Sequence, residues 1–295
     1  MPATLVPAYV TMRSWFDLRT ASIAMLLCAF SPLATAMGRR ALADPLASLL
    51  VVTALALFEH ARVDPRRRFL VALGAVLTAA LLTKEGLCFV WPAFAGVALV
   101  HWRQGRPVPR SLLLPFLAAP IVTICVLVFF CGGLGKLGST YSAYVAASEK
   151  IPYANQFQRG AWFRYLVDLV LLNPIPLLSA VAGVVAPSKR NRDGALVAAG
   201  FLLPSLAAFS ALSMLNVRFI LSADVVCRGL AAVAISRIAD WFGRNNPPNA
   251  IPITLLAGLA LVVDVHQFNR IFVQGQVYDP VTAELVRANG FVRSP

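Results

Sequence analysis

Apolar residues dominate nine long segments of the chain, and short polar segments separate them. The apolar segments cover residues 20–36, 45–59, 69–83, 86–101, 111–131, 165–186, 194–213, 217–236 and 250–266. A helix needs roughly 20 residues to cross the hydrocarbon of a bilayer, and it tolerates proline there. The pattern predicts an all-α fold, a polytopic transmembrane helical bundle of about nine spans. We expect this domain to occupy residues 1–266 and an extracytoplasmic polar tail to occupy residues 267–295.

Two of the predicted spans carry a weaker signal than the others. Residues 69–83 and 86–101 are shorter than the roughly 20 residues that a span needs, and they almost touch at Thr83-Lys84-Glu85-Gly86. They are interpreted either as two tilted spans or as a re-entrant pair.

The composition supports a membrane environment. Hydrophobic residues make up 59% of the 295 residues before glycine is counted, whereas a soluble domain has roughly 45–50% with glycine included. Charged residues are 13%, about half of the usual share. So few charges cannot cover a soluble surface, and the same figures exclude a disordered chain or a disulfide scaffold. The five cysteines lie in or beside apolar runs without a CxxC pair, which indicates small buried side chains.

Positive charge is distributed unevenly between the two predicted sides of the bundle. The net charge is +13, and with residues 1–19 placed inside the cell the inside segments hold 14 Lys and Arg in 58 residues. The outside segments hold 10 in 74 residues. This bias predicts a multi-pass protein of the plasma (inner) membrane with a cytoplasmic N-terminus and an extracytoplasmic C-terminus. Anchoring to anionic membrane lipid accounts for much of the charge, so no nucleic acid is predicted as a partner.

Polar residues at the outer ends of the spans are costly to keep there, which makes them candidates for function. The first cluster contains Arg39, Arg40 and Asp44. Two guanidinium groups beside a carboxylate could hold a lipid phosphate and orient an acceptor. Asp44 followed by Pro45 is also typical of a plain helix N-terminus, so a capping role stays open.

The next two clusters contain single cations beside apolar runs. Lys84 is interpreted as a phosphate-binding ammonium positioned by Glu85, or else the two residues form a neutral pair that caps a tight turn. Arg218, in the segment Asn216-Val217-Arg218-Phe219, could pair with a phosphate. Arg228 lies within a span, and we expect it to pair structurally with Asp224, four residues earlier.

A further cluster lies in the predicted loop 132–161 and at the start of the following span. Its aromatic, amide and charged side chains suit sugar faces and hydroxyls, although an interfacial aromatic belt has the same composition. The substrate-binding candidates are Tyr153, Gln156, Arg159, Arg164 and Tyr165. The three histidines of the chain are isolated from one another, so the sequence assigns no metal ligands and leaves a requirement for a divalent metal open.

Several short segments occur in an order that resembles a known family. Ser31-Pro32 within an apolar run is followed by Arg39-Arg40-Ala41-Leu42-Ala43-Asp44-Pro45 at the start of the next span. Leu82-Thr83-Lys84-Glu85-Gly86 leads to Trp91-Pro92, and residues 157–176 lead into the middle spans before Asn216-Val217-Arg218-Phe219. Over about residues 20–266 this order resembles the polytopic GT-C glycosyltransferases, most closely the protein mannosyltransferase and aminoarabinose transferase type.

The resemblance implies a function and roles for particular residues. Such enzymes take a sugar from a polyprenyl-phosphate donor at the outer membrane face and transfer it, with inversion, to an acceptor on a protein, lipid or glycan. In this family a general base, usually an acidic residue in the first outer loop, activates the acceptor. Asp44 would be the second acidic catalytic residue, near the acceptor or a metal. Lys84 and Arg218 would hold the donor phosphate, whose charge develops as it leaves.

One departure from the family pattern leaves alternatives open. The family's first outer loop, with its principal acid, is expected upstream of a span such as 20–36, where this chain has only 19 residues. The resemblance therefore predicts a truncated and inactive copy, a misassigned start or a partner that supplies the missing part. A non-catalytic membrane assembly subunit is one alternative. A secondary transporter or flippase is another, and it predicts inverted repeats and discontinuous helices around charges near mid-membrane.

Overall fold

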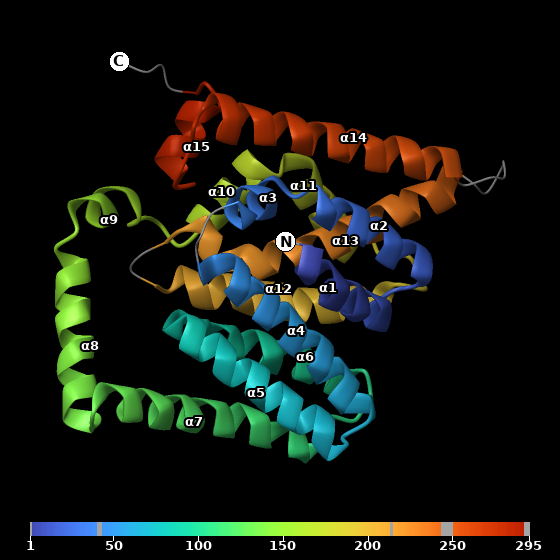
Figure 1. The fold of residues 1–295 in the computed structure, drawn as a ribbon. Helices are drawn as coiled ribbons and strands as arrows, with labels where there is room; N and C mark the ends of the chain where they lie inside the picture. The colour runs from blue at the N-terminus through green and yellow to red at the C-terminus, as the bar shows by residue number, and fades with distance from the viewer. Residues whose placement is uncertain (1, 40–42, 213–214, 243–249, 292–295) are drawn as a thin grey trace.

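The computed structural model describes residues 2–39, 43–212, 215–242 and 250–291, and these residues form helices and no strands. Most helices lie side by side in a bundle, with α13 in the middle and α14 and α7 at opposite edges (Figure 1). The predicted all-α fold is therefore confirmed. The longer helices are α1 (Pro2–Trp15), α2 (Leu18–Ala29), α4 (Ala43–Val63), α5 (Arg67–Thr83), α6 (Trp91–Arg103), α7 (Leu113–Cys131), α8 (Leu134–Glu149), α11 (Pro174–Val185), α12 (Arg192–Ser210), α13 (Leu221–Phe242) and α14 (Ala250–Phe268).

Short helices extend or connect the long ones. They are α3 (Pro32–Gly38), η1 (Glu85–Val90), η2 (Arg110–Leu112), α9 (Pro152–Phe157), α10 (Arg164–Leu172), η3 (Val217–Ile220), η4 (Asn269–Gln274) and α15 (Thr282–Ala288). All nine predicted apolar segments contain helix. The described residues nevertheless contain six helical stretches that are long and apolar enough to cross a membrane: Ala43–Val63, Glu85–Arg103, Arg110–Cys131, Arg192–Ser210, Val217–Phe242 and Ile251–Gln274.

The predicted count of nine spans is only approximate, because two predicted spans are bent. The axes of α2 and α3 differ by 52°, and those of α10 and α11 differ by 118°. At the first bend Ser31 caps α3 by accepting a hydrogen bond from the amide of Ala34, and Pro32 follows it. The described residues contain up to eight spans if each bent pair counts as one, and the 17-residue α5 is not among them.

The N-terminal segment differs from its prediction. Residues 1–19 are predicted to form an inside segment without a span, but α1 packs against α2, α4 and α12 and buries Met12 completely. The apolar pattern missed α1 because the helix is only 14 residues long and contains Pro7. Its early residue Thr4 shares a small pocket with Pro45, at the start of α4, whereas Trp15 reaches the end of α4. The helix α1 therefore runs parallel to α4.

The predicted loop at 132–161 is also largely helical. Its residues form α8 and α9, and α8 runs across the side of the molecule, away from the bundle (Figure 1). Most of the described side chains of α8 are exposed, and the helix packs mainly on α7 and α9. Sequence reasoning missed this helix because a helix that stands apart from the core shows no buried apolar face.

Ion pairs sort the polar segments into two groups at opposite ends of α4. At the end that carries Glu59, the predicted inside segments contact one another through Arg19 and Asp240 at 2.8 Å and through Arg106 and Asp193 at 2.9 Å. Glu59 itself is buried and accepts hydrogen bonds from Trp15 of α1 and Arg62 of α4. Predicted outside segments meet at the other end, near Asp44. The other segments alternate as expected, but the start of α1, beside Pro45, lies at the Asp44 end and not with the other predicted inside segments. The side of the membrane that each end faces stays a prediction.

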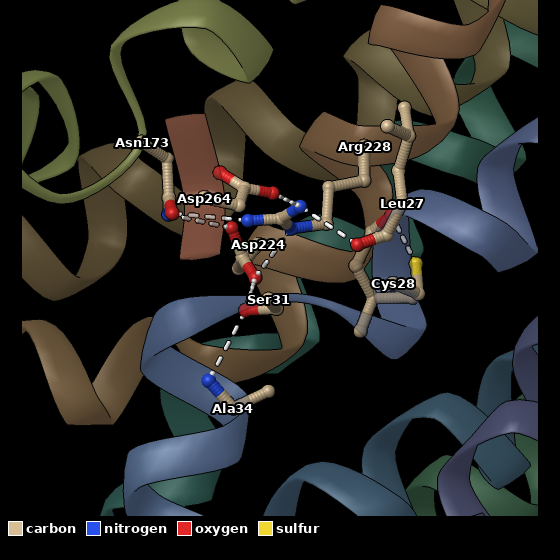
Figure 2. A network of polar contacts seen from close by, with 9 residues as sticks. Leu27, Cys28, Ser31, Ala34, Asn173, Asp224, Arg228 and Asp264 are labelled. Carbon is tan, nitrogen blue, oxygen red and sulfur yellow. Dashed lines mark hydrogen bonds and ion pairs between the residues drawn. The ribbon is translucent and has the colours of Figure 1, made fainter. Parts of the chain in front are cut away.

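The centre of the bundle contains a buried ionic network around Arg228 of α13 (Figure 2). Its guanidinium donates hydrogen bonds to Asp224 at 3.1 Å and to Asp264 of α14 at 2.5 Å. It also donates to the carbonyl of Leu27 at 2.7 Å and to the side chain of Asn173 at 2.9 Å. The predicted pairing with Asp224 is confirmed, and Asp264 is a second acidic partner that sequence reasoning did not identify.

The network joins both helix bends to the central helix. Asp224 accepts hydrogen bonds from Ser31, at the α2–α3 bend, at 2.6 Å and from Asn173, at the α10–α11 bend, at 3.0 Å. A bend frees backbone groups and shortens the helices, so bent segments need polar partners inside the protein. Arg228 bonds the carbonyl of Leu27, and Asp224 bonds the side chains of Ser31 and Asn173, so the network ties both bends to α13.

We expect Arg228→Met to destabilise the protein strongly. The substitution keeps most of the side-chain volume but leaves two buried carboxylates without their cation, which costs about 3–5 kcal/mol. The free energy of unfolding in detergent, measured by denaturant titration, tests this. The matched control is Arg106→Met, which removes an exposed ion pair worth about 0–1 kcal/mol. A loss for Arg228→Met as small as that of the control would contradict the structural role of the network.

Candidate functional site

Three predicted site residues from distant parts of the chain meet at one end of the bundle. Asp44 lies in the first turn of α4, Lys84 follows the end of α5, and Arg218 lies in η3. The ammonium of Lys84 hydrogen-bonds one carboxylate oxygen of Asp44. The other carboxylate oxygen lies 3.7 Å from Nε of Arg218. The structure therefore brings together Asp44 and two of the predicted phosphate-binding cations.

The Lys84 side chain is held from two sides. Its ammonium lies 4.0 Å from the centroid of the Phe219 ring, in the geometry of a cation–π contact. Burial lowers the pKa of Lys84, and the carboxylate of Asp44 opposes this by stabilising the charged form. Lys84 pairs with Asp44 rather than with its neighbour Glu85, so the interpretation as a self-contained capping pair is wrong.

Arg218 lies between two carboxylates and forms ion pairs with both at 3.7 Å, to Asp44 through Nε and to Asp279 through Nη1. Neither distance is short enough for a hydrogen bond. The Nε atom is buried and has no hydrogen-bond partner. A buried donor without an acceptor is costly, so this guanidinium is poised to bind an additional oxygen.

A pocket of about 170 Å³ opens at these residues. One part of its lining is polar and contains Asp44, Lys84, Glu85 and Arg218. The remainder is largely apolar, and Tyr144 of α8 reaches the pocket as well. The apolar lining residues are Ala47, Val51, Leu87, Phe209, Leu212, Phe219 and Leu221. Such a pocket suits an anionic head group that is attached to an apolar chain.

Asp279 is a site residue that the sequence analysis did not single out. It follows α14 and η4 in the predicted polar tail, which folds back over the end of the bundle. Its carboxylate accepts hydrogen bonds from Asn216 at 2.7 Å, Tyr153 at 3.0 Å and Gln158 at 3.3 Å. Burial raises the pKa of Tyr153 to about 12, and the nearby Asp279 charge adds to this shift. The only sequence signal for Asp279 is its place in a polar stretch after the last span.

Other predicted site residues do not line the Asp44 pocket. Arg39 is exposed at the C-terminal end of α3, and Arg40 lies outside the described residues. Gln156 and Arg159 line a separate surface groove beside α15. Tyr165 is buried, and its hydroxyl accepts a hydrogen bond from the amide of Asn216 at 3.3 Å.

Arg164 connects α10 to the C-terminal segment. It is buried, and its guanidinium donates to the Thr282 hydroxyl at 2.6 Å and to the carbonyl of Arg159 at 2.9 Å. A further hydrogen bond goes to the carbonyl of Phe157. Thr282 in turn donates to Asp168 at 2.6 Å. With these partners in place, Arg164 is built to hold α15 against α10.

The chemistry available at the Asp44 pocket follows from its groups. Two cations can neutralise a phosphate, and a carboxylate within reach of both can accept a proton once it is no longer paired with Lys84. Among the described residues there is no group of three or more His, Cys, Asp and Glu side chains placed to hold a metal ion.

Two comparisons with known proteins agree with the predicted resemblance. Residues 1–131 match the family described as dolichyl-phosphate-mannose-protein mannosyltransferase. The fold matches a crystal structure of ArnT from Cupriavidus metallidurans bound to undecaprenyl phosphate, with a TM-score of 0.56 and 16% sequence identity. That match covers 97% of this chain and 59% of the ArnT chain. No curated protein matches the chain in sequence. The resemblance to GT-C membrane glycosyltransferases is thereby confirmed.

We expect Arg164→Gln to loosen the C-terminal segment. The substitution removes charged hydrogen bonds to Thr282 and to two carbonyls, which lowers the free energy of opening α15 by about 1–3 kcal/mol. Amide hydrogen exchange of residues 282–288 measures this. Arg159→Gln is the control, because that side chain is exposed and should leave the exchange unchanged. Equal exchange in wild type and Arg164→Gln would show that Arg164 does not hold α15.

Proposed function

We propose that this protein is a membrane glycosyltransferase that transfers a sugar from a polyprenyl-phosphate donor to an acceptor at the extracytoplasmic face. The observation that carries the proposal is the pocket in which Lys84 and Arg218 flank Asp44, with the Nε atom of Arg218 lacking a hydrogen bond. The match to the mannosyltransferase family and the fold shared with ArnT support it.

The pocket suits a lipid phosphate better than a free one. A phosphate between Lys84 and Arg218 would give Nε of Arg218 its missing acceptor and would replace Asp44 as the partner of the ammonium. The apolar lining would hold the first isoprene units beside the phosphate. A free phosphate would leave that apolar surface uncovered.

Asp44 is the proposed general base. While the donor site is empty, Lys84 occupies one of its oxygens. Binding of the donor phosphate draws Lys84 away, and the freed carboxylate can accept the proton of an acceptor hydroxyl. The acceptor oxygen then forms a bond to the anomeric carbon, the bond from that carbon to the phosphate oxygen breaks, and polyprenyl phosphate leaves. Lys84 and Arg218 stabilise the charge that develops on the leaving phosphate.

A transporter or flippase is the second candidate, because the structure contains two bent helix pairs around a charged centre. In transporters such discontinuous helices surround a substrate site. Here every guanidinium nitrogen of Arg228 donates to a protein acceptor, and the neighbouring pocket holds only about 30 Å³. These contacts favour a structural role for the charged centre, so the glycosyltransferase is the stronger proposal.

The proposed roles predict opposite effects of two substitutions on lipid binding. Lys84→Ala should weaken binding of undecaprenyl phosphate about 10-fold or more, because a charged hydrogen bond is lost. Asp44→Asn should bind undecaprenyl phosphate as well as wild type or better, because a competing negative charge is gone. It should nevertheless lower sugar transfer about 10²–10⁴-fold, as loss of a general base does. Binding is measured with labelled lipid, and transfer with membranes and labelled polyprenyl-phosphate sugars.

The control for both variants is Lys136→Ala, because Lys136 is an exposed cation of α8 outside the pocket. It should keep wild-type binding and transfer. Full transfer by both Asp44→Asn and Lys84→Ala would overturn the site assignment. Movement of labelled lipid across vesicle membranes without any transfer would favour the flippase, and neither activity would favour an assembly subunit.

A further inference from the structure

A second pocket lies beside Arg218 and Asp279. It has a volume of about 400 Å³ and is more open than the first. Arg218 is the one residue common to the two linings as the structure describes them. The other lining residues come from α9 and from the C-terminal segment: Tyr153, Gln276, Tyr278, Asp279 and Glu284.

We propose that this second pocket binds the sugar of the donor, and that residues 276–284 therefore complete the site. The inference rests on the proposed function, because it assumes a phosphate at Lys84 and Arg218. A phosphate there would place a directly attached group beside Arg218, at the entrance of the second pocket. The sugar ring would then lie between Tyr153 and the C-terminal segment.

The chemistry of the lining favours a hydroxyl-rich ring. Gln276 offers an amide donor and acceptor, Glu284 offers carboxylate acceptors, and Tyr278 offers an aromatic ring with a hydroxyl. Sugar hydroxyls both donate and accept, so they fit this mixture. Arg218 is the only basic residue among the described lining residues, and two carboxylates share the pocket. A second phosphate would be repelled, so the site fits a lipid monophosphate sugar and not a diphosphate-linked one.

Gln276, in the C-terminal segment, has an unusual backbone conformation and lines the second pocket. This residue has a φ angle of 48°, in the left-handed region that non-glycine residues seldom adopt. Strained backbone of this kind is retained where the surrounding structure enforces it, and it is common at ligand sites. Here the neighbouring residues are anchored, since Ile271 and Val277 are buried on either side.

Asp279 is a positioning residue in this arrangement. Three donors from α9, its C-terminal cap and the N-terminal cap of η3 converge on its carboxylate. Three of the roughly four acceptor sites of this carboxylate are therefore engaged within the protein. The contacts hold the C-terminal segment, Tyr153 and Arg218 in fixed relation, so that one ligand can extend from the first pocket into the second.

The test compares lipids with and without a sugar. Undecaprenyl phosphate and the undecaprenyl-phosphate esters of glucose, mannose and arabinose compete with labelled undecaprenyl phosphate for the purified chain in nanodiscs. We expect wild type to bind at least one glycosylated lipid more tightly than undecaprenyl phosphate. Gln276→Ala should reduce that preference about 3- to 10-fold, as loss of a hydrogen bond does, while binding of undecaprenyl phosphate stays within about twofold.

Two further variants separate contact from positioning. Gln274→Ala is the matched control, because Gln274 is exposed two residues earlier and does not line the pocket. It should leave the preference unchanged. Asp279→Asn keeps the shape of the side chain but removes its charge and one acceptor oxygen. It should reduce the preference for glycosylated lipids over undecaprenyl phosphate. It should also alter the affinity for undecaprenyl phosphate itself, because Arg218 loses its ion pair with Asp279.

The outcomes distinguish this inference from the proposed function. If Lys84→Ala weakens binding of all lipids while Gln276→Ala leaves the preference intact, the phosphate site stands and the sugar subsite is wrong. If wild type binds no glycosylated lipid more tightly than undecaprenyl phosphate, the sugar subsite is also wrong. If Lys84→Ala binds every lipid as wild type does, the proposed function fails as well.

Discussion

The buried ion pairs of Arg228 are the interaction on which the architecture depends. A guanidinium in the middle of a membrane bundle is costly unless every donor has an acceptor, and here Asp224, Asp264, Asn173 and a carbonyl supply them. These partners come from both helix bends and from α14, so the charge cannot be satisfied unless the bends and the last long helix are in place. The need to satisfy this one charge thereby aligns three separate parts of the chain, the two bends and α14, around α13.

The candidate site is a consequence of that alignment. With α13 fixed, η3 at its start presents Arg218 toward the first turn of α4, where Asp44 lies. The helix α5 ends so that Lys84 reaches the same carboxylate. One part of the site is built on helix ends of the bundle. The other part is the C-terminal segment, which is held by side-chain hydrogen bonds. The proposed phosphate site lies on the helix ends, and the proposed sugar site lies beside the C-terminal segment.

Sequence reasoning succeeded for the fold where local pattern decides the structure. Long apolar segments predicted the helices, and the positions of the cations predicted which segments share an end of the bundle, except for the start of α1. It failed at α1 and α8, because a short helix with a proline and a helix away from the core lack the expected apolar periodicity. The predicted count of nine spans is approximate, because a bend at Ser31 or Asn173 leaves the hydropathy of a segment unchanged and α5 is short for a span.

The sequence by itself determined that this is a helical membrane protein, and it placed Asp44, Lys84 and Arg218 within a longer set of candidates, because charge at the end of an apolar span is costly wherever it occurs. Only the tertiary structure decided that the three residues meet, that Lys84 pairs with Asp44 instead of Glu85, and that Asp279 reaches Arg218. These are contacts between residues 40 or more positions apart. Long-range pairing depends on how the helices pack and bend, so it cannot be predicted from a local pattern of residues.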